Sequence, residues 1–285
     1  MLALDSIVKQ TSDLPVFSTA VQEVIRIADN ESTSAADVGR ALQGDPALAA
    51  KILRLANSSW FGLTRSIESL DQAVVLLGRK GIRSLAIAAS SYAWLSRDLP
   101  GWSLGPKQLW LHSSSAALAA NLLARRSRLT EPDLALTAGL LHDIGMVALS
   151  MSLESKTKAI KAYAQREKLT FPKVEQKVLG FDHCQVGAEL AGSWGIPDRV
   201  VEAIRWHHEP QKAEEGFCLA ATIHSGIHLA DELGYGLTSC GFSFEPDPVA
   251  LKAVGLSVKV KRDLADTLKR EMDEYQRLFS GGPDA

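Results

Sequence analysis

Apolar residues recur at helical spacing along most of this chain, and that periodicity limits the fold more than any other feature. In residues 16–29, for example, Val21, Val24, Ile25 and Ala28 share one face of a helix. We find neither a convincing alternation of apolar and polar residues, which would predict a strand, nor a strand–helix repeat. The sequence therefore predicts an all-α protein.

The predicted helices fall into two blocks. About five helices are predicted in the first hundred residues, with a break at Gly78. Residues 97–106 (RDLPGWSLGP) hold two prolines and two glycines without periodicity, which is typical of a linker. We therefore predict a two-block helical bundle, with an N-terminal block at 1–100, a helical core at 101–240, and a loop with an amphipathic C-terminal helix at 241–285.

The charge balance limits the class of partner. Lys and Arg total 31 against 33 for Asp and Glu, a net charge of -2, whereas a broad nucleic-acid surface needs a basic excess. The N-terminus MLALDSIVKQTSDLP lacks the features of a signal peptide. No uncharged apolar run reaches the length of about 18 residues that suggests a membrane span. We therefore expect a cytoplasmic protein with no membrane contact.

Three cysteines, Cys184, Cys218 and Cys240, occur without paired spacing. Such a sparse, odd set is neither a disulfide framework nor a thiolate zinc site. Cys184 adjoins one of the candidate metal ligands described next, but we interpret it as a buried free thiol.

Five of the seven histidines, with two aspartates, lie at the ends or on the buried faces of predicted helices. Imidazoles and carboxylates that converge from several helices form metal sites in helical bundles. The predicted helix that ends at His142 is expected to turn at Gly145, in a left-handed conformation. The candidate metal ligands are His112, His142, Asp143, His183, His207, His208 and Asp231.

Two of these positions suit metal binding for local reasons. Asp182 is a plausible N-cap, which places His183 at the positive end of a helix, where the neutral imidazole that binds metals is favoured. Asp231 lies beside the apolar residues Ile227 and Ala230, and a buried carboxylate requires a partner or a cation.

Two alternatives compete with this site. A single helical histidine is more often a hydrogen-bonded core or surface residue than a ligand, and periodicity does not show that the segments converge. His224, His228 and Asp231 also share a helical face at spacings of four and three, which suits a metal by spacing alone. One helix face rarely completes a metal site, however.

The order His … His-Asp … His … His-His … Asp, with LLHDIG at 140–145, resembles the HD superfamily of metal-dependent phosphohydrolases. Three N-terminal stretches resemble the first half of HDOD domains, the HD-related output domains of bacterial signalling. They are LPVFSTAVQEVIRIAD, GDPALAAKILRLANSSWFG (44–62) and SIESLDQAVVLLGRKGIRSLAI (66–87). The segment HCQVGAELAGSWGIPDRVVEAIRWHHEP (183–210) resembles the second half, so the likeness covers about residues 13–235.

The resemblance implies two metal positions bridged by Asp143. One would be held by His112, His142, Asp143 and Asp231, and the other by His183, His207 and His208. In catalytic HD enzymes, two cations activate water and clamp a phosphoryl group. HDOD domains are mostly regarded as non-catalytic relatives that have lost part of this set, whereas this chain keeps every position.

The chain departs from the related cyclic-di-GMP phosphodiesterases at three places. Those enzymes carry a lysine where this chain has Met146, and a DGxGYP stretch where it has HHEPQKAEEG. They often carry a glutamate one turn before the first histidine, where this chain has Gln108. These differences argue against hydrolysis of cyclic-di-GMP.

Two functions from different classes follow. The first is a signalling output protein that binds a signalling protein or a small phosphorylated or nucleotide ligand, with Trp60 and Phe61 as exposed apolar candidates for contact. A homodimer through the last helix, about 258–279, is an alternative to its packing on its own bundle. The second is a metal-dependent phosphohydrolase acting on a nucleotide or phosphodiester, with His208 or Glu209 assisting proton transfer. The mixed ligands suit Fe, Mn, Ni, Co, Zn or Mg, at one or two positions.

Overall fold

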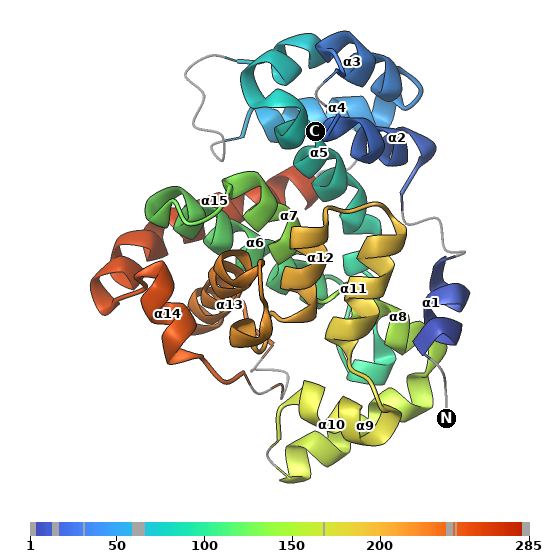
Figure 1. Ribbon diagram of the computed structural model, residues 1–285, viewed down its shortest axis with the longest axis vertical. Helices are drawn as coiled ribbons and strands as arrows, with labels where there is room; N and C mark the ends of the chain where they lie inside the picture. Colours follow the sequence, from blue (N-terminus) through green and yellow to red (C-terminus); the bar gives the residue numbers. More distant parts are fainter. Residues whose placement is uncertain are drawn as a thin grey trace. The chain divides into compact units, whose positions relative to one another are not determined.

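The computed structural model describes residues 4–12, 17–30, 32–58, 66–167, 169–237, 242 and 244–280. Within these residues the regular elements are helices, apart from one isolated bridge between Leu99 and Leu104, which confirms the predicted all-α class (Figure 1). Trp60, Phe61 and Cys240 lie outside the described residues. The chain divides into two compact units, which we call the small unit (Pro15–Tyr92 with Asp266–Ala285) and the large unit (Met1–Leu14 with Ala93–Ala265).

The small unit contains short helices whose starts follow from the sequence. Ser34 and Asp37 form a capping box at the start of α3, and Asp45 caps α4, whose first residue is Pro46. Gly78 interrupts α5 with φ 72°, ψ 169°, a conformation that L-residues with a side chain avoid. The helices are α2 (Thr19–Ala28), α3 (Ala35–Gln43), α4 (Pro46–Ala56), most of α5 (Leu70–Leu95) and the end of α15 (Val258–Ser280).

The large unit is built around α6 (Gln108–Ser127), which packs against α7 (Pro132–Leu141) and α13 (Phe217–Glu232) (Figure 1). The other helices are α1 (Leu4–Ser12), η2 (Pro100–Trp102), α8 (Ile144–Ser152), α9 (Glu154–Glu167), α10 (Phe171–Leu179), α11 (His183–Ser193), α12 (Asp198–Arg205), η3 (Pro210–Lys212), α14 (Pro248–Val254) and the start of α15. The division into 1–100, 101–240 and 241–285 stays a prediction.

Small residues allow close helix approach around α6. A Cβ atom added at Gly226 of α13 would lie 2.8 Å from the Ala116 carbonyl oxygen, and one added at Gly139 of α7 would lie 2.7 Å from Ala117 Cα. Both approaches are closer than a side chain permits, so α6, α7 and α13 pack backbone to backbone. This packing fixes the distance between His112 on α6 and the end of α7.

Two segments differ in role from what their composition predicts. Residues 97–106 contain the short helix η2 and the Leu99–Leu104 bridge. Leu99, Trp102 and Leu104 are buried, and the Trp102 indole N–H donates to the Met146 carbonyl oxygen at 2.9 Å. Residues Pro132–Ser152, which comprise α7 and α8, contain an 18-residue window with a mean hydropathy of 1.5, so this stretch is long and apolar enough to cross a membrane. Because 94% of that window is buried inside the molecule, core packing accounts for its apolar character.

Candidate metal centre

The turn between α7 and α8 carries the central pair of polar side chains. His142 ends α7, and Asp143 precedes α8. Gly145 lies inside α8 and does not have a positive φ, so the expected left-handed turn at this residue was wrong. The glycine instead permits contact with α11, because a Cβ atom at Gly145 would lie 2.0 Å from the His183 carbonyl oxygen. This contact brings the start of α11 to the turn.

The first group of ligand atoms consists of His112, His142 and Asp143, all buried. His142 Nε2 lies 3.2 Å from His112 Nε2 and 3.2 Å from Asp143 Oδ2, and His112 Nε2 lies 3.4 Å from Asp143 Oδ2. A tetrahedral cation with bonds of about 2.0–2.1 Å separates its ligand atoms by about 3.3 Å. The three atoms therefore have the spacing of one face of a metal coordination shell.

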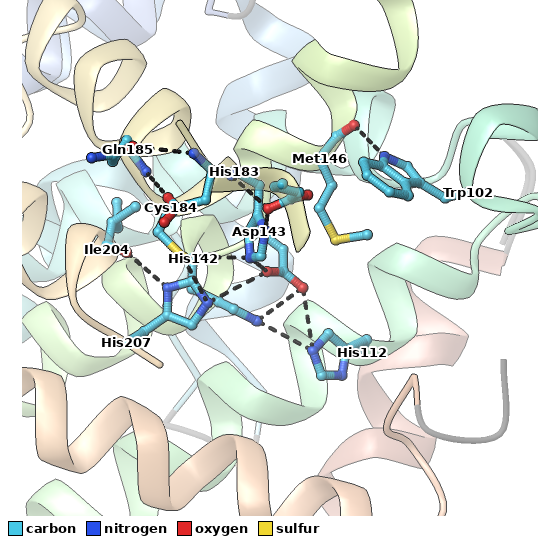
Figure 2. Close-up of polar contacts among 12 residues, drawn as sticks. Trp102, His112, His142, Asp143, Met146, His183, Cys184, Gln185, Ile204 and His207 are labelled. Carbon is cyan, nitrogen blue, oxygen red and sulfur yellow. Dashed lines mark hydrogen bonds and ion pairs between the residues drawn. The ribbon is translucent and has the colours of Figure 1, made fainter. Parts of the chain in front are cut away.

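The second group meets the other oxygen of the same carboxylate. Asp143 Oδ1 lies 3.3 Å from His183 Nε2 and 3.6 Å from His207 Nε2. Figure 2 shows these imidazoles turned toward Asp143 from the side opposite His112. The group is completed by Cys184 and His208, and its four ligand atoms lie within 4.8 Å of one another. Asp143 thus faces each group with a different oxygen, which is the arrangement of a bridging carboxylate.

Hydrogen bonds on the far sides of the rings orient their Nε2 atoms. His142 Nδ1 lies 2.7 Å from the Gly139 carbonyl oxygen, and His207 Nδ1 lies 2.7 Å from that of Ile204. Because a carbonyl oxygen only accepts, each Nδ1 carries a proton, so in the neutral imidazole the lone pair lies on Nε2, the nitrogen on the side of Asp143. This tautomer is the one that binds a cation through Nε2.

The protonation states around Asp143 also suit a cation. Burial alone would raise the pKa of the Asp143 carboxyl, but His142 and the hydrogen bonds from the surrounding imidazoles hold that pKa well below its usual range. Burial lowers the pKa of His207 to about 4. At neutral pH the centre therefore presents an ionised carboxylate and a neutral His207, and both are forms that bind metals. An imidazole that donates to Asp143 through Nε2 gives up that proton when a cation binds.

Glu175 is a functional residue that the sequence analysis missed. It is fully buried on α10, and its Oε2 accepts from His183 Nδ1 at 2.6 Å and from the His183 backbone N–H at 2.9 Å. Burial alone would lower the pKa of His183, but Cys184 and the two carboxylates raise it well above the usual range. The sequence does contain one indication of the role of Glu175. Its carboxylate lies on the apolar face of α10, together with Phe171, Val174 and Leu179.

We expect Glu175→Gln to weaken metal binding roughly 10- to 100-fold, the usual cost of removing a carboxylate behind a histidine ligand. The amide retains the size of the side chain but loses the charge that orients His183 and increases its basicity. Metal titration of the wild type and the variant measures the change, with the exposed Glu189→Gln on α11 as control. Equal affinities for the wild type and Glu175→Gln would contradict this role.

Comparison with known proteins supports the same assignment of family. The profile of the HDOD domain matches residues 14–210. This chain belongs to the HDOD family. Among solved structures, an HDOD domain protein of Geobacter sulfurreducens has the same fold, with a TM-score of 0.73, 22% identity, and coverage of 96% of this chain and 97% of that one. A candidate phosphohydrolase of Shewanella amazonensis is similar to this chain with a TM-score of 0.69 and 25% identity. The match covers 96% of this chain and 98% of that one.

Two curated relatives of this HDOD protein are longer than the chain. An uncharacterized protein of Treponema pallidum is 28% identical over 226 residues, which are 76% of this chain and 42% of that protein. Ribonuclease Y of Aquifex aeolicus is 38% identical over 101 residues, which are 35% of this chain and 13% of the enzyme. The HDOD chain therefore corresponds to less than half of either relative.

The other predicted site residues of the HDOD domain occupy different positions. Asp231, on α13, lines a small cavity beside the two ligand groups. The ligand groups found in the described residues do not include it. His208 is half-buried, belongs to the second group and reaches the cavity, and burial lowers its pKa. Glu209 is exposed, accepts from Lys212 at 2.8 Å, and is not among the described cavity residues.

The competing set on α13 does not form a ligand group in the part of the chain that the structure describes. His224 Nδ1 donates to the His207 carbonyl oxygen at 2.8 Å, and its Nε2 accepts from the Asp247 backbone N–H at 2.7 Å. Both ring nitrogens are therefore used within the fold. His228 Nε2 lies 2.8 Å from Lys261 Nζ, a contact that does not suit a cation site.

A small cavity of about 40 Å³ adjoins the centre. A buried water needs at least about 10–15 Å³ on this measure, so the space suits a few waters. Its polar wall is His112, His142, Asp143, His183, His208 and Asp231, and its apolar wall is Met146, Phe171, Ile227, Leu237, Phe242 and Phe244. The described lining residues include no lysine or arginine.

Proposed function

We propose that this protein is a signalling output protein of HDOD type, which acts by binding a partner protein or a small ligand. Its HD-type centre would hold one or two divalent cations as a structural or ligand-sensing element. Membership of the HDOD family supports the signalling role, because these are output domains of bacterial signalling. The two ligand groups that meet at Asp143 support the metal.

The lining and the volume of the cavity beside the centre support ligand binding rather than catalytic turnover. Enzymes that transfer phosphoryl groups surround the substrate with cationic side chains as well as metal ions. The described cavity wall contains no such side chain, and Met146 occupies the position where related phosphodiesterases have a lysine. A space of about 40 Å³ also suits water and not a nucleotide.

Partner binding would use the small unit, the part that resembles the first half of HDOD domains. Val75 and Leu76, at the beginning of α5, leave 75% and 56% of their surface exposed. Neighbouring exposed apolar side chains of this size are typical of contact surfaces. We therefore add Val75 and Leu76 to Trp60 and Phe61 as candidate residues for contact with a signalling protein.

The second candidate function is a metal-dependent phosphohydrolase acting on a nucleotide or phosphodiester. The complete ligand set favours it, because two bound cations would activate water and hold a phosphoryl group. His208, at the cavity, would then be positioned to move a proton. Two similar proteins carry names of this class, the candidate phosphohydrolase of Shewanella amazonensis and ribonuclease Y of Aquifex aeolicus.

One assay separates these functions. The full chain, loaded in turn with Mn, Fe, Ni, Zn or Mg, is incubated with nucleotides, cyclic dinucleotides and short RNA, beside Asp143→Ala. We expect metal to be retained by the wild type and turnover to equal that of the variant for every substrate. Turnover well above the Asp143→Ala control would overturn the non-catalytic proposal and establish the hydrolase.

A further inference from the structure

Cys184 lies within the second group of ligand atoms. It is the second residue of α11, and its side chain is buried, with 3% of its surface exposed. Its Sγ lies 3.5 Å from His183 Nε2 and 4.0 Å from His207 Nε2. Figure 2 shows the sulfur beside the same ring nitrogens that face Asp143. The sulfur is therefore placed where two imidazole nitrogens already converge.

These separations match a shared coordination shell. A tetrahedral cation with a metal–sulfur bond of about 2.3 Å and metal–nitrogen bonds of about 2.0–2.1 Å holds sulfur and nitrogen about 3.6 Å apart. The two observed distances lie on either side of this value. His208 contributes a further imidazole within the same 4.8 Å limit.

We propose that Cys184 is a metal ligand of the second position, where its thiolate joins the imidazoles of His183, His207 and His208 beside the bridging carboxylate of Asp143. This inference rests on the metal centre proposed above. The structure confirms that Cys184 is buried and forms no disulfide. The inference adds a metal as its partner, which the sequence did not indicate because His207 is distant from Cys184 along the chain.

A hydrogen-bonded thiol is the competing interpretation. The S–H group is a weak donor and a single proton serves one acceptor, whereas Sγ lies near two Nε2 atoms. Because Ile204 fixes the proton of His207 on Nδ1, the Nε2 of that ring directs a lone pair toward the space beside the sulfur. A cation there satisfies the nitrogens and the sulfur together, and the thiol proton leaves to solvent on binding.

A thiolate ligand changes the chemistry of the centre. Three imidazoles, the thiolate and Oδ1 of Asp143 fill the coordination shell with protein ligands. Filled shells are typical of structural sites, whereas catalytic sites keep a position open for water or substrate. Sulfur also favours Zn, Fe or Co over Mg and Mn. The second position would therefore hold a tightly bound, non-catalytic cation, which fits a signalling protein.

Cobalt substitution tests the ligand directly, because a cobalt–thiolate bond gives an intense near-ultraviolet charge-transfer band. The full chain, freed of metal and reloaded with Co²⁺, should show this band, as should Cys218→Ser, whose cysteine lies on α13 outside both ligand groups. Cys184→Ser and Cys184→Ala should lack the band. Elemental analysis of the Cys184 variants should still find about one equivalent of cobalt, the amount that the first group would hold, and circular dichroism should show unchanged helix content.

X-ray absorption at the cobalt edge tests the cobalt–sulfur bond in the wild-type protein, without a variant. We expect scattering from a sulfur atom about 2.3 Å from cobalt. Cobalt bound without the band or the sulfur shell would overturn the role of Cys184 and leave the metal centre intact. A band that persists in both Cys184 variants would also overturn it. A wild-type chain that takes up no cobalt would overturn the metal centre and this inference together.

Discussion

Asp143→Ala is expected to remove both metal positions, reducing bound metal from as many as two equivalents to none. The two oxygens of this carboxylate face different ligand groups, with Oδ2 at 3.2 Å from His142 Nε2 and Oδ1 at 3.3 Å from His183 Nε2. Loss of the side chain therefore removes the carboxylate that both positions share in the described structure, and four neighbouring imidazoles lose their common partner. An imidazole cluster without its carboxylate binds divalent cations much more weakly, because it lacks the charge that offsets the cation's loss of water.

Variants on either side of Asp143 give the matched comparison. His142→Ala should reduce binding at the first position alone, and His183→Ala at the second alone, so each retains about half of the wild-type metal. Elemental mass spectrometry of proteins purified under the same metal supply measures this, with circular dichroism as a check on folding. If Asp143→Ala retains as much metal as His142→Ala, the carboxylate is not shared.

The helices of this protein were predictable because their signals are local. Apolar spacing indicated α2, and the predicted N-cap Asp182 marks a helix start that the structure confirms. The buried state of Trp102 was not predictable, because prolines and glycines around it are equally typical of an exposed connection. In the structure the indole packs against Phe171 and Phe242 and donates to the Met146 carbonyl oxygen, and these residues are distant in the sequence.

The candidate site was predictable only as a set of residues and not as an arrangement. A family motif orders the histidines along the chain, but the contact of Glu175 with His183 depends on how α10 meets α11. The same limit explains His224, whose helical spacing suits a metal although the fold uses both of its ring nitrogens. Spacing reports which residues share a helix face, whereas ligand geometry depends on contacts between helices.

Gly145→Ala is expected to destabilise the contact between α8 and α11 that positions His183. The new Cβ atom would lie 2.0 Å from the His183 carbonyl oxygen and 2.8 Å from the Gly187 backbone nitrogen. Both are backbone atoms of α11, so the contact cannot be relieved by rotating a side chain. We expect α8 and α11 to separate, at a cost of about 3 kcal/mol in unfolding free energy. Because His183 begins α11, metal binding at the second position should weaken with it.

Gly192→Ala is the matched control, since it makes the same change near the end of the same helix, α11, where nothing lies within 4 Å of the added Cβ atom. Alanine favours a helix over glycine by roughly 0.5–1 kcal/mol, so this variant should be as stable as the wild type or slightly more stable. Urea unfolding with and without metal compares the three proteins. A Gly145→Ala protein with wild-type stability and metal content would mean that α8 and α11 can separate without disturbing His183, so their contact would not be what positions this ligand.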